Sequence, residues 1–115
     1  NCYWEWTDSY NGKGVAGYIV YKVKDASDKG KKKNGSGSST TTVASYSLSN
    51  AHIFLPASGY RSLLALNYAG DSGSYWSSSL ISRDGANDLG FSAGGVFRIT
   101  ASYRYIGQSV RGVCK

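Results

Sequence analysis

The sequence predicts one small, loop-rich folded domain with several short strands and few short helices. Its 115 residues suffice for a single hydrophobic core. Several short segments alternate apolar and polar residues, and no segment has a sustained 3.6-residue apolar repeat. With 41% apolar and 17% charged residues, 15 glycines and one proline, the composition is that of a folded, turn-rich chain and excludes a disordered tail.

The clearest strand covers residues 17–24. Ile19, Tyr21 and Val23 share one face of it, and two lysines lie on the other face. The segment from about 28 to 46 is rich in Gly, Ser, Thr and Lys. Because it cannot bury enough apolar surface to offset the entropy of ordering, we expect a long mobile loop there.

Further strands and a hairpin are predicted in the rest of the chain. The strands are expected at residues 51–55, 88–92, 96–100, 103–106 and 109–113. Ala93, Gly94 and Gly95 separate two of them, and glycine accepts the positive φ of a tight hairpin turn. Short helices are expected only at 45–50 or within 8–16.

The charge of the chain is basic but clustered. Thirteen Lys and Arg against seven Asp and Glu give a net charge of +6, which is typical of nucleic-acid binding. Much of the excess comes from Lys29 and the three lysines at 31–33. Such a cluster in a Gly/Ser loop is usually solvated surface, so we expect no nucleic-acid partner. Since no apolar run reaches 18 residues, we also expect no direct membrane insertion.

The two cysteines lie at opposite ends of the chain, at Cys2 and Cys114. Their spacing is not that of a zinc site. A disulfide between them would place the protein in an oxidising, extracytoplasmic compartment. Two unpaired buried thiols in a cytosolic protein are the alternative. The chain starts without Met or a signal peptide, so we interpret it as the mature or excised part of a longer polypeptide.

Two motifs resemble catalytic or cofactor sites without the structural context these need. Residues 12–17 match G-x-G-x-x-G, but they lead into a predicted strand and not into a helix. Residues 90–94 match G-x-S-x-G, but the single histidine, His52, lies upstream and is expected to pack or hydrogen-bond on a strand. No aspartate spacing specifies a calcium site. We therefore expect no enzyme activity, no cofactor and no metal.

Four phrases in the second half of the chain resemble one family. They are LPASGYR at 55–61, GSYWSSS at 73–79, LGF at 89–91 and YRYIGQSVR at 103–111. In this order they resemble the Fibrobacter-type major paralogous domain, which occurs in surface and secreted proteins of Bacteroidetes and their relatives. The resemblance covers roughly residues 51–113. In addition, residues 4–7 (WEWT) are similar to a phrase of formylglycine-generating enzymes, but the reactive cysteines of those enzymes are not matched.

The resemblance implies an α+β fold of the C-type lectin-like kind, with a mixed or antiparallel sheet, few short helices and long loops. Residues 1–115 would form a single such domain, with a variable or binding region at about 62–106. The termini of that fold lie close together, which suits a disulfide between Cys2 and Cys114. Trp76, Leu89 and Phe91 are then expected in the core.

A gap in composition suggests diversification. Residues 34–107 contain no Lys, Glu, Gln or Met, and Trp occurs there once. These five are the amino acids that an AAC or AAT codon cannot yield when its two adenines are replaced. Such a gap is expected of a diversity-generating retroelement, which acts on receptors of the C-type lectin-like kind. A plain bias towards Ser, Gly and Tyr is the alternative interpretation.

The alternation of side chains along the predicted hairpin indicates which residues form a binding face. If Leu89 and Phe91 point inward and Val96 does so on the return strand, then Phe97 and Ile99 point outward. Exposed residues of this size indicate a contact surface. A register slip that buries both is the alternative. The full set of predicted ligand-binding residues is Leu63, Leu64, Tyr68, Ile81, Arg83, Asp84, Asn87, Phe97, Ile99, Tyr103, Tyr105 and Ile106.

The sequence thus predicts a non-catalytic ligand-binding module of a secreted or cell-surface protein. The ligand would be a protein or a glycan on another cell or surface. The alternatives are a structural adhesin or fimbrial tip domain, and a carbohydrate-binding module whose tyrosines, or Trp4 or Trp6, stack on sugar rings.

Overall fold

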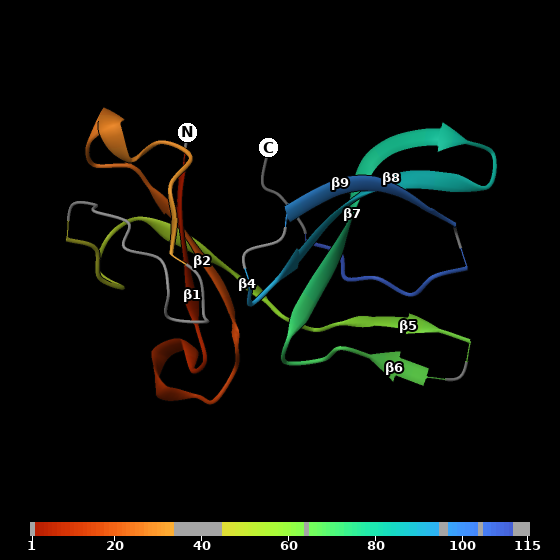
Figure 1. Cartoon of the computed structure of the whole chain (residues 1–115), viewed down its shortest axis with the longest axis horizontal. Helices are drawn as coiled ribbons and strands as arrows, with labels where there is room; N and C mark the ends of the chain where they lie inside the picture. Colours follow the sequence, from red (N-terminus) through yellow and green to blue (C-terminus); the bar gives the residue numbers. More distant parts are fainter. Residues whose placement is uncertain (1, 34–44, 64, 95–96, 104, 112–115) are drawn as a thin grey trace. The chain divides into compact units, whose positions relative to one another are not determined.

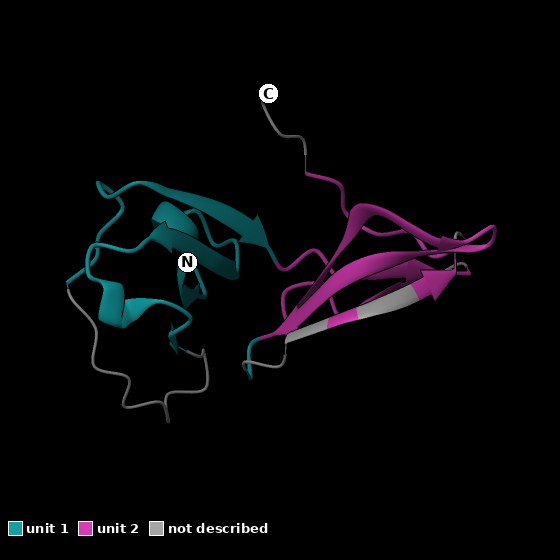
Figure 2. Cartoon of the chain, turned by 90° about the horizontal axis from the view of Figure 1, so that it is seen from above, with its two compact units in different colours: residues 1–56, 93–95 teal, residues 57–92, 96–115 magenta. Residues whose placement is uncertain are grey.

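The chain folds as a set of short β-strands. The computed structural model describes residues 2–33, 45–63, 65–94, 97–103 and 105–111, and no helix there reaches seven residues (Figure 1). None of the helices in these ranges is long and apolar enough to cross a membrane. The chain divides into two compact units: residues 1–56 with 93–95 form unit 1, and residues 57–92 with 96–115 form unit 2 (Figure 2).

Unit 1 contains a four-stranded sheet with the order β3–β1–β2–β4. Its strands are β1 (Cys2–Thr7), β2 (Gly17–Lys22), β3 (Lys32–Lys33) and β4 (His52–Pro56). β2 pairs antiparallel with β1 and β4, and β3 runs parallel to β1. Two 3₁₀ turns, Tyr10–Gly12 and Ala26–Asp28, complete the unit. The predictions of strands at 17–24 and 51–55 are confirmed, whereas β1 was not predicted.

Aromatic side chains fill the core of unit 1. Tyr3 and Tyr21 are cross-strand partners on one face of the sheet, with ring centroids 6.0 Å apart, and Ile19 is buried beside them. On the other face, Trp6 packs edge-on against its cross-strand partner Tyr18 at 5.1 Å. Cross-strand aromatic pairs stabilise a sheet beyond the area they bury. Burial raises the pKa of the Tyr18 phenol to about 12.

A buried aspartate lies at the start of the segment that was expected to be a mobile loop. Asp28 is almost fully buried, and Tyr46 Oη donates a hydrogen bond of 2.8 Å to its carboxylate. The Lys31 ammonium lies 3.7 Å from the same carboxylate. Residues 28–33 of the expected loop contain a turn and the two residues Lys32–Lys33 of a short strand, and the mobility of the loop stays a prediction. Residues 34–44 lie outside the described part of the chain.

Unit 2 contains a hairpin and a three-stranded sheet. β5 (Tyr60–Ser62) pairs antiparallel with β6 (Ala65–Asn67). β7 (Ser72–Ser82), β8 (Gly85–Ser92) and β9 (Phe97–Tyr103) form an antiparallel sheet in that order. The hairpin predicted around residues 93–95 is thus confirmed as the connection from β8 to β9. Of the strand expected at 103–106, only Tyr103 belongs to β9.

Among the described residues of unit 2, Phe91 is the best-buried large side chain, with 3% of its surface exposed. Its ring lies across its cross-strand partner Gly73, where a Cβ atom would stand 2.3 Å from a ring carbon. Tyr75, two residues further along β7, stacks on Phe91 with centroids 6.0 Å apart. The core position predicted for Phe91 is confirmed, whereas Trp76 and Leu89 are only half-buried.

The α+β, C-type lectin-like fold expected from the resemblance is wrong: the chain is all-β, with three small sheets and 55% strand. Positive φ angles at Asn11 (50°) and Gly12 (70°) prevent a longer helix within 8–16. At 45–50 a turn replaces the expected helix, because the Asn50 side chain accepts a hydrogen bond from the Ser47 backbone N–H.

The predicted disulfide falls partly outside the described residues. Cys2 begins β1 and is a free, half-buried thiol in the structure. Cys114 lies outside the described part of the chain, so the pairing of the two cysteines stays a prediction.

The packing of unit 2 predicts that a core substitution and a surface substitution differ strongly in their effect on stability. Phe91→Ala should lower the free energy of unfolding by about 3–5 kcal/mol, because it leaves a cavity over Gly73. Ile99→Ser should change it by no more than about 0.5 kcal/mol, because 79% of the Ile99 side chain is exposed. Chemical denaturation measures both. A tolerated Phe91→Ala with a destabilising Ile99→Ser would contradict this assignment of core and surface.

The buried tyrosines of unit 1 predict alkaline destabilisation. An unfolded tyrosine ionises near pH 10, whereas folded Tyr18 keeps its proton up to about pH 12. The folded state therefore holds more protons in this window, and the free energy of unfolding should be constant below pH 10 and fall above it. Urea unfolding at about pH 9 and about pH 11 measures the difference. In Tyr18→Phe, the fall above pH 10 should be shallower.

Candidate functional site

The predicted ligand-binding residues lie in unit 2 but not at one place. Leu63 lies at the β5–β6 turn and Tyr68 follows β6, whereas Leu64 lies outside the described residues. A second group, Ile81, Arg83 and Asp84, lies at the exposed tip of the β7–β8 hairpin. The third group lies on or just after β8 and β9: Asn87, Phe97, Ile99, Tyr103, Tyr105 and Ile106.

The third group is the one in which the structure shows two side chains in contact, those of Tyr103 and Tyr105. Ile99 and Tyr103 point to the same face of β9, and Asn87 on β8 is paired with Ala101 between them. Tyr103 lies opposite Gly85, so no cross-strand side chain covers its ring. Tyr105 stacks on Tyr103 with centroids 5.5 Å apart and an angle of 8° between the rings. We call Ile99, Tyr103 and Tyr105 the aromatic patch.

All three members of the aromatic patch are open to solvent. The exposed fractions are 79% for Ile99, 62% for Tyr103 and 70% for Tyr105. Asn87 beside them and Ile106 after them are half-buried. The exposure predicted for Ile99 is therefore confirmed. Phe97 begins β9, but its side chain is not among those described.

The observed pairing of β8 with β9 shows that the face predicted for Ile99 relative to Leu89 was wrong. Leu89 pairs with Ile99, so these two side chains share a face. The prediction placed Leu89 and Ile99 on opposite faces, because it assumed that Val96 points to the same face as Phe91. A shift of one residue moves every side chain of a strand to the other face.

The face of β8 opposite Leu89 and Phe91 holds a buried carboxylate, that of Asp88. Asp88 accepts hydrogen bonds from Ser102 Oγ at 2.8 Å and from Gln108 Nε2 at 2.9 Å. Gln108 Oε1 is buried and has no hydrogen-bond partner among the described residues. Asp88 thus ties β8, β9 and the segment after β9 together on the face of the sheet opposite Ile99 and Tyr103.

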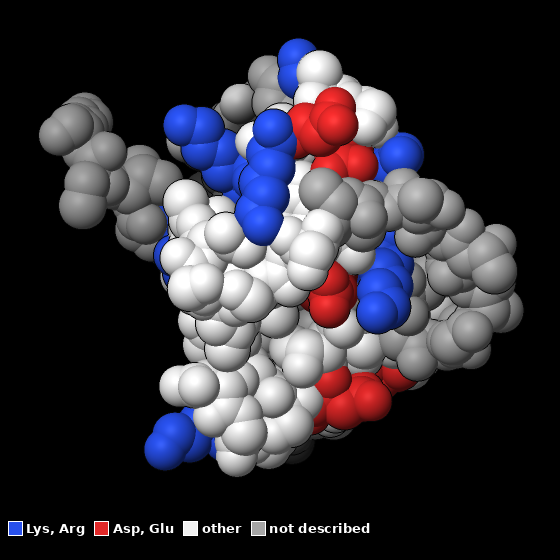
Figure 3. All heavy atoms as spheres, turned by 90° about the vertical axis from the view of Figure 1, so that its left-hand side faces the viewer, with Lys and Arg blue, Asp and Glu red and all other residues white. Residues whose placement is uncertain are grey.

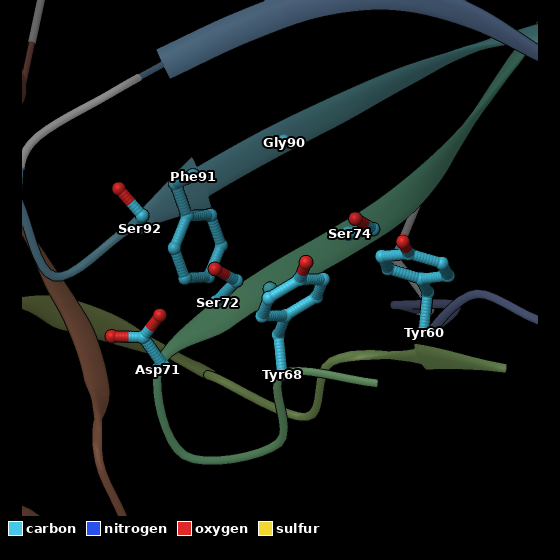
Figure 4. Close-up of a pocket in the computed structure, with 9 residues that line it drawn as sticks. Tyr60, Tyr68, Asp71, Ser72, Ser74, Gly90, Phe91 and Ser92 are labelled. Carbon is cyan, nitrogen blue, oxygen red and sulfur yellow. The ribbon is translucent and has the colours of Figure 1, made fainter. Parts of the chain in front are cut away.

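Unit 2 also contains a pocket that the sequence did not predict. Its cavity has a volume of about 370 Å³ and opens between Tyr60 on β5, Tyr68 after β6, and the ends of β7 and β8 (Figure 4). The residues that line it are Tyr60, Tyr68, Asp71, Ser72, Gly73, Ser74, Gly90, Phe91 and Ser92. Of these only Tyr68 was predicted, because the others follow no periodic pattern and meet only through strand pairing.

The motifs that resemble catalytic sites have structural roles here. Gly17, the last glycine of G-x-G-x-x-G, begins strand β2 and not a helix. Both ring nitrogens of His52 are engaged: Nε2 with Tyr10 Oη at 2.8 Å and Nδ1 with the Asn50 carbonyl at 2.7 Å. The part of the chain that the structure describes contains no group of three or more His, Cys, Asp or Glu able to hold a metal ion.

Positive and negative side chains share one face of the molecule. Figure 3 shows Lys and Arg side chains interspersed with Asp and Glu on the face it presents. An exposed ion pair elsewhere on the surface joins Arg83 to Asp84 at 3.8 Å. The absence of a nucleic-acid partner stays a prediction.

No family model matches the chain, and no curated protein or solved structure is significantly similar to it. The function is therefore argued from the residues of the two surface features, the aromatic patch and the pocket.

The Asp88 network predicts a large loss of stability when its acceptor is removed. Asp88→Ala should lower the free energy of unfolding by about 1–3 kcal/mol, because the donors of the half-buried Ser102 and Gln108 lose their partner. Asp84→Ala, at the exposed hairpin tip, is the matched control and should stay within about 0.5 kcal/mol. Thermal or chemical denaturation compares the two. Equal effects would contradict a structural role for Asp88.

Proposed function

We propose that the chain is a non-catalytic ligand-binding module of a secreted or cell-surface protein, and that it binds a protein ligand through the aromatic patch. The observation that carries this proposal is the exposure of Ile99, Tyr103 and Tyr105 on and just after one strand. Tyrosine supplies a large contact area at a low cost in side-chain entropy, and it is enriched in binding surfaces for that reason.

The distribution of exposed apolar side chains supports the proposal. Nine of the twelve large apolar side chains that are exposed among the described residues belong to unit 2. Three of these nine are the members of the aromatic patch, and exposed apolar patches mark interaction sites. Ile99 and Tyr103 lie on a strand whose backbone is already fixed by pairing with β8. Less conformational entropy is therefore lost when they bind a ligand.

The composition supports diversification of this surface. The exposed residues Leu63, Ile81, Ile99, Tyr103 and Tyr105 are all of types that an AAC or AAT codon can reach by replacement of its adenines. We therefore propose that the region at about 62–106 is a variable region shaped by a retroelement. The resemblance of residues 51–113 to a family of surface and secreted proteins supports an extracytoplasmic location.

A structural adhesin or assembly domain is the second candidate. β9 is an edge strand of its sheet, and an edge strand offers backbone hydrogen-bonding groups to a strand of another subunit. Concentration-dependent self-association that is lost in an edge variant such as Ile99→Pro would favour this candidate over ligand binding.

An array of purified extracellular proteins tests the proposed function. The labelled chain should bind at least one protein on the array, and the double variant Tyr103→Ser/Tyr105→Ser should bind it about tenfold or more weakly, because large aromatic anchors carry most of the energy of an interface. The melting temperature of this variant should stay nearly unchanged, since both side chains are exposed.

Two exposed apolar residues of unit 1 provide the matched control. Val15→Ser/Ile53→Ser removes exposed apolar surface outside unit 2 and should leave binding unchanged. If no protein on the array distinguishes the native chain from the Tyr103/Tyr105 variant, the proposal is wrong.

A further inference from the structure

We propose that the pocket of unit 2 binds the terminal residue of a neutral saccharide. The pocket shares no residue with the aromatic patch, so this inference does not depend on the proposed protein ligand. It rests on three observations: two tyrosine rings, a set of polar groups opposite them, and the size and charge of the cavity.

The two tyrosines form the apolar side of the pocket. The rings of Tyr60 and Tyr68 lie 5.9 Å apart at an angle of 37°, and in Figure 4 both project towards the start of β7. A pyranose ring presents C–H groups on its faces, and these pack on the electron-rich face of an aromatic ring. Two rings inclined to one another can hold one sugar ring from two directions.

Polar groups line the opposite side of the pocket. The Asp71 carboxylate lies at one end, and the hydroxyls of Ser72 and Ser74 project from β7 (Figure 4). None of these three side chains has a hydrogen-bond partner among the described residues. A carboxylate accepts hydrogen bonds from two neighbouring sugar hydroxyls, and serine both donates and accepts. The groups of the pocket therefore match a ligand that has one apolar face and a rim of hydroxyls.

The size and charge of the cavity narrow the ligand class. A volume of about 370 Å³ is near the lower limit for small-molecule sites, so it suits one or two sugar rings. Among the described residues that line the pocket, the only charged side chain is that of Asp71. A carboxylated or sulfated sugar would meet a like charge at Asp71, so the described lining favours a neutral sugar.

The backbone at Tyr68 places its ring in the pocket at a cost in stability. Tyr68 has a φ of +57°, a conformation that is unfavourable for a large side chain. Hydrogen bonds from the backbone N–H groups of Asp71 and Ser72 to the Tyr68 carbonyl hold this turn. Asparagine adopts positive φ more readily than tyrosine does. Replacing Tyr68 by Asn should therefore remove the ring without destabilising the turn.

Nuclear magnetic resonance titration with methyl glycosides tests the inference. The probes are the methyl glycosides of glucose, galactose, mannose and N-acetylglucosamine, and sialic acid is the anionic comparison. At least one neutral glycoside should bind with a Kd on the order of millimolar. Tyr68→Asn and Asp71→Asn should each weaken binding about tenfold. The melting temperature of Tyr68→Asn should not fall below that of the native chain.

Two residues outside the pocket provide matched controls. Tyr105→Ala removes an exposed tyrosine and Asp84→Asn an exposed carboxylate, and both variants should bind the glycoside as the native chain does. The inference is overturned if no neutral glycoside saturates, if sialic acid binds more tightly, or if the pocket variants and the controls bind equally. Loss of protein binding in the Tyr103/Tyr105 variant with intact glycoside binding would separate this site from the aromatic patch.

Discussion

The arrangement of β8, β9 and the segment after β9, which carry the aromatic patch, depends on one buried carboxylate. Asp88 lies in the central strand of the three-stranded sheet, and Ser102 and Gln108 donate hydrogen bonds to it from β9 and from the segment that follows. A buried charge is costly unless donors satisfy it, so these segments are held where their donors reach Asp88. Because Ser102 points towards Asp88, the alternation of β9 turns Tyr103 to the opposite face, where its ring is exposed.

Unit 1 uses the same device in a different setting. The buried Asp28 accepts a hydrogen bond from Tyr46, and this contact ties two segments that lie far apart in sequence. Around them, tyrosine and tryptophan pairs across β1 and β2 supply the packing that aliphatic residues supply in most small domains. The phenols among them must stay neutral, so the stability of this unit is tied to pH on the alkaline side.

The two surface features suit different ligands because their shapes differ. The aromatic patch is exposed and apolar, and such a surface gains binding energy by excluding water over a broad contact. The pocket is concave and mixes two rings with hydroxyls and one carboxylate, so it selects by hydrogen-bond geometry. A module with both features could contact a glycosylated protein at two points, and the effective concentration of the second contact would then raise the overall affinity.

The sequence by itself determined the local features of this protein. The alternation at 17–24 and the glycines at 94 and 95 predicted β2 and the β8–β9 hairpin, because side-chain period and glycine's backbone freedom act within a few residues. Only the tertiary structure decided the all-β fold, the face on which Ile99 lies, the burial of Asp88 and the pocket around Tyr60. Each of these depends on cross-strand register or on contacts between distant segments, and a shift of one residue in pairing reverses which side chains meet.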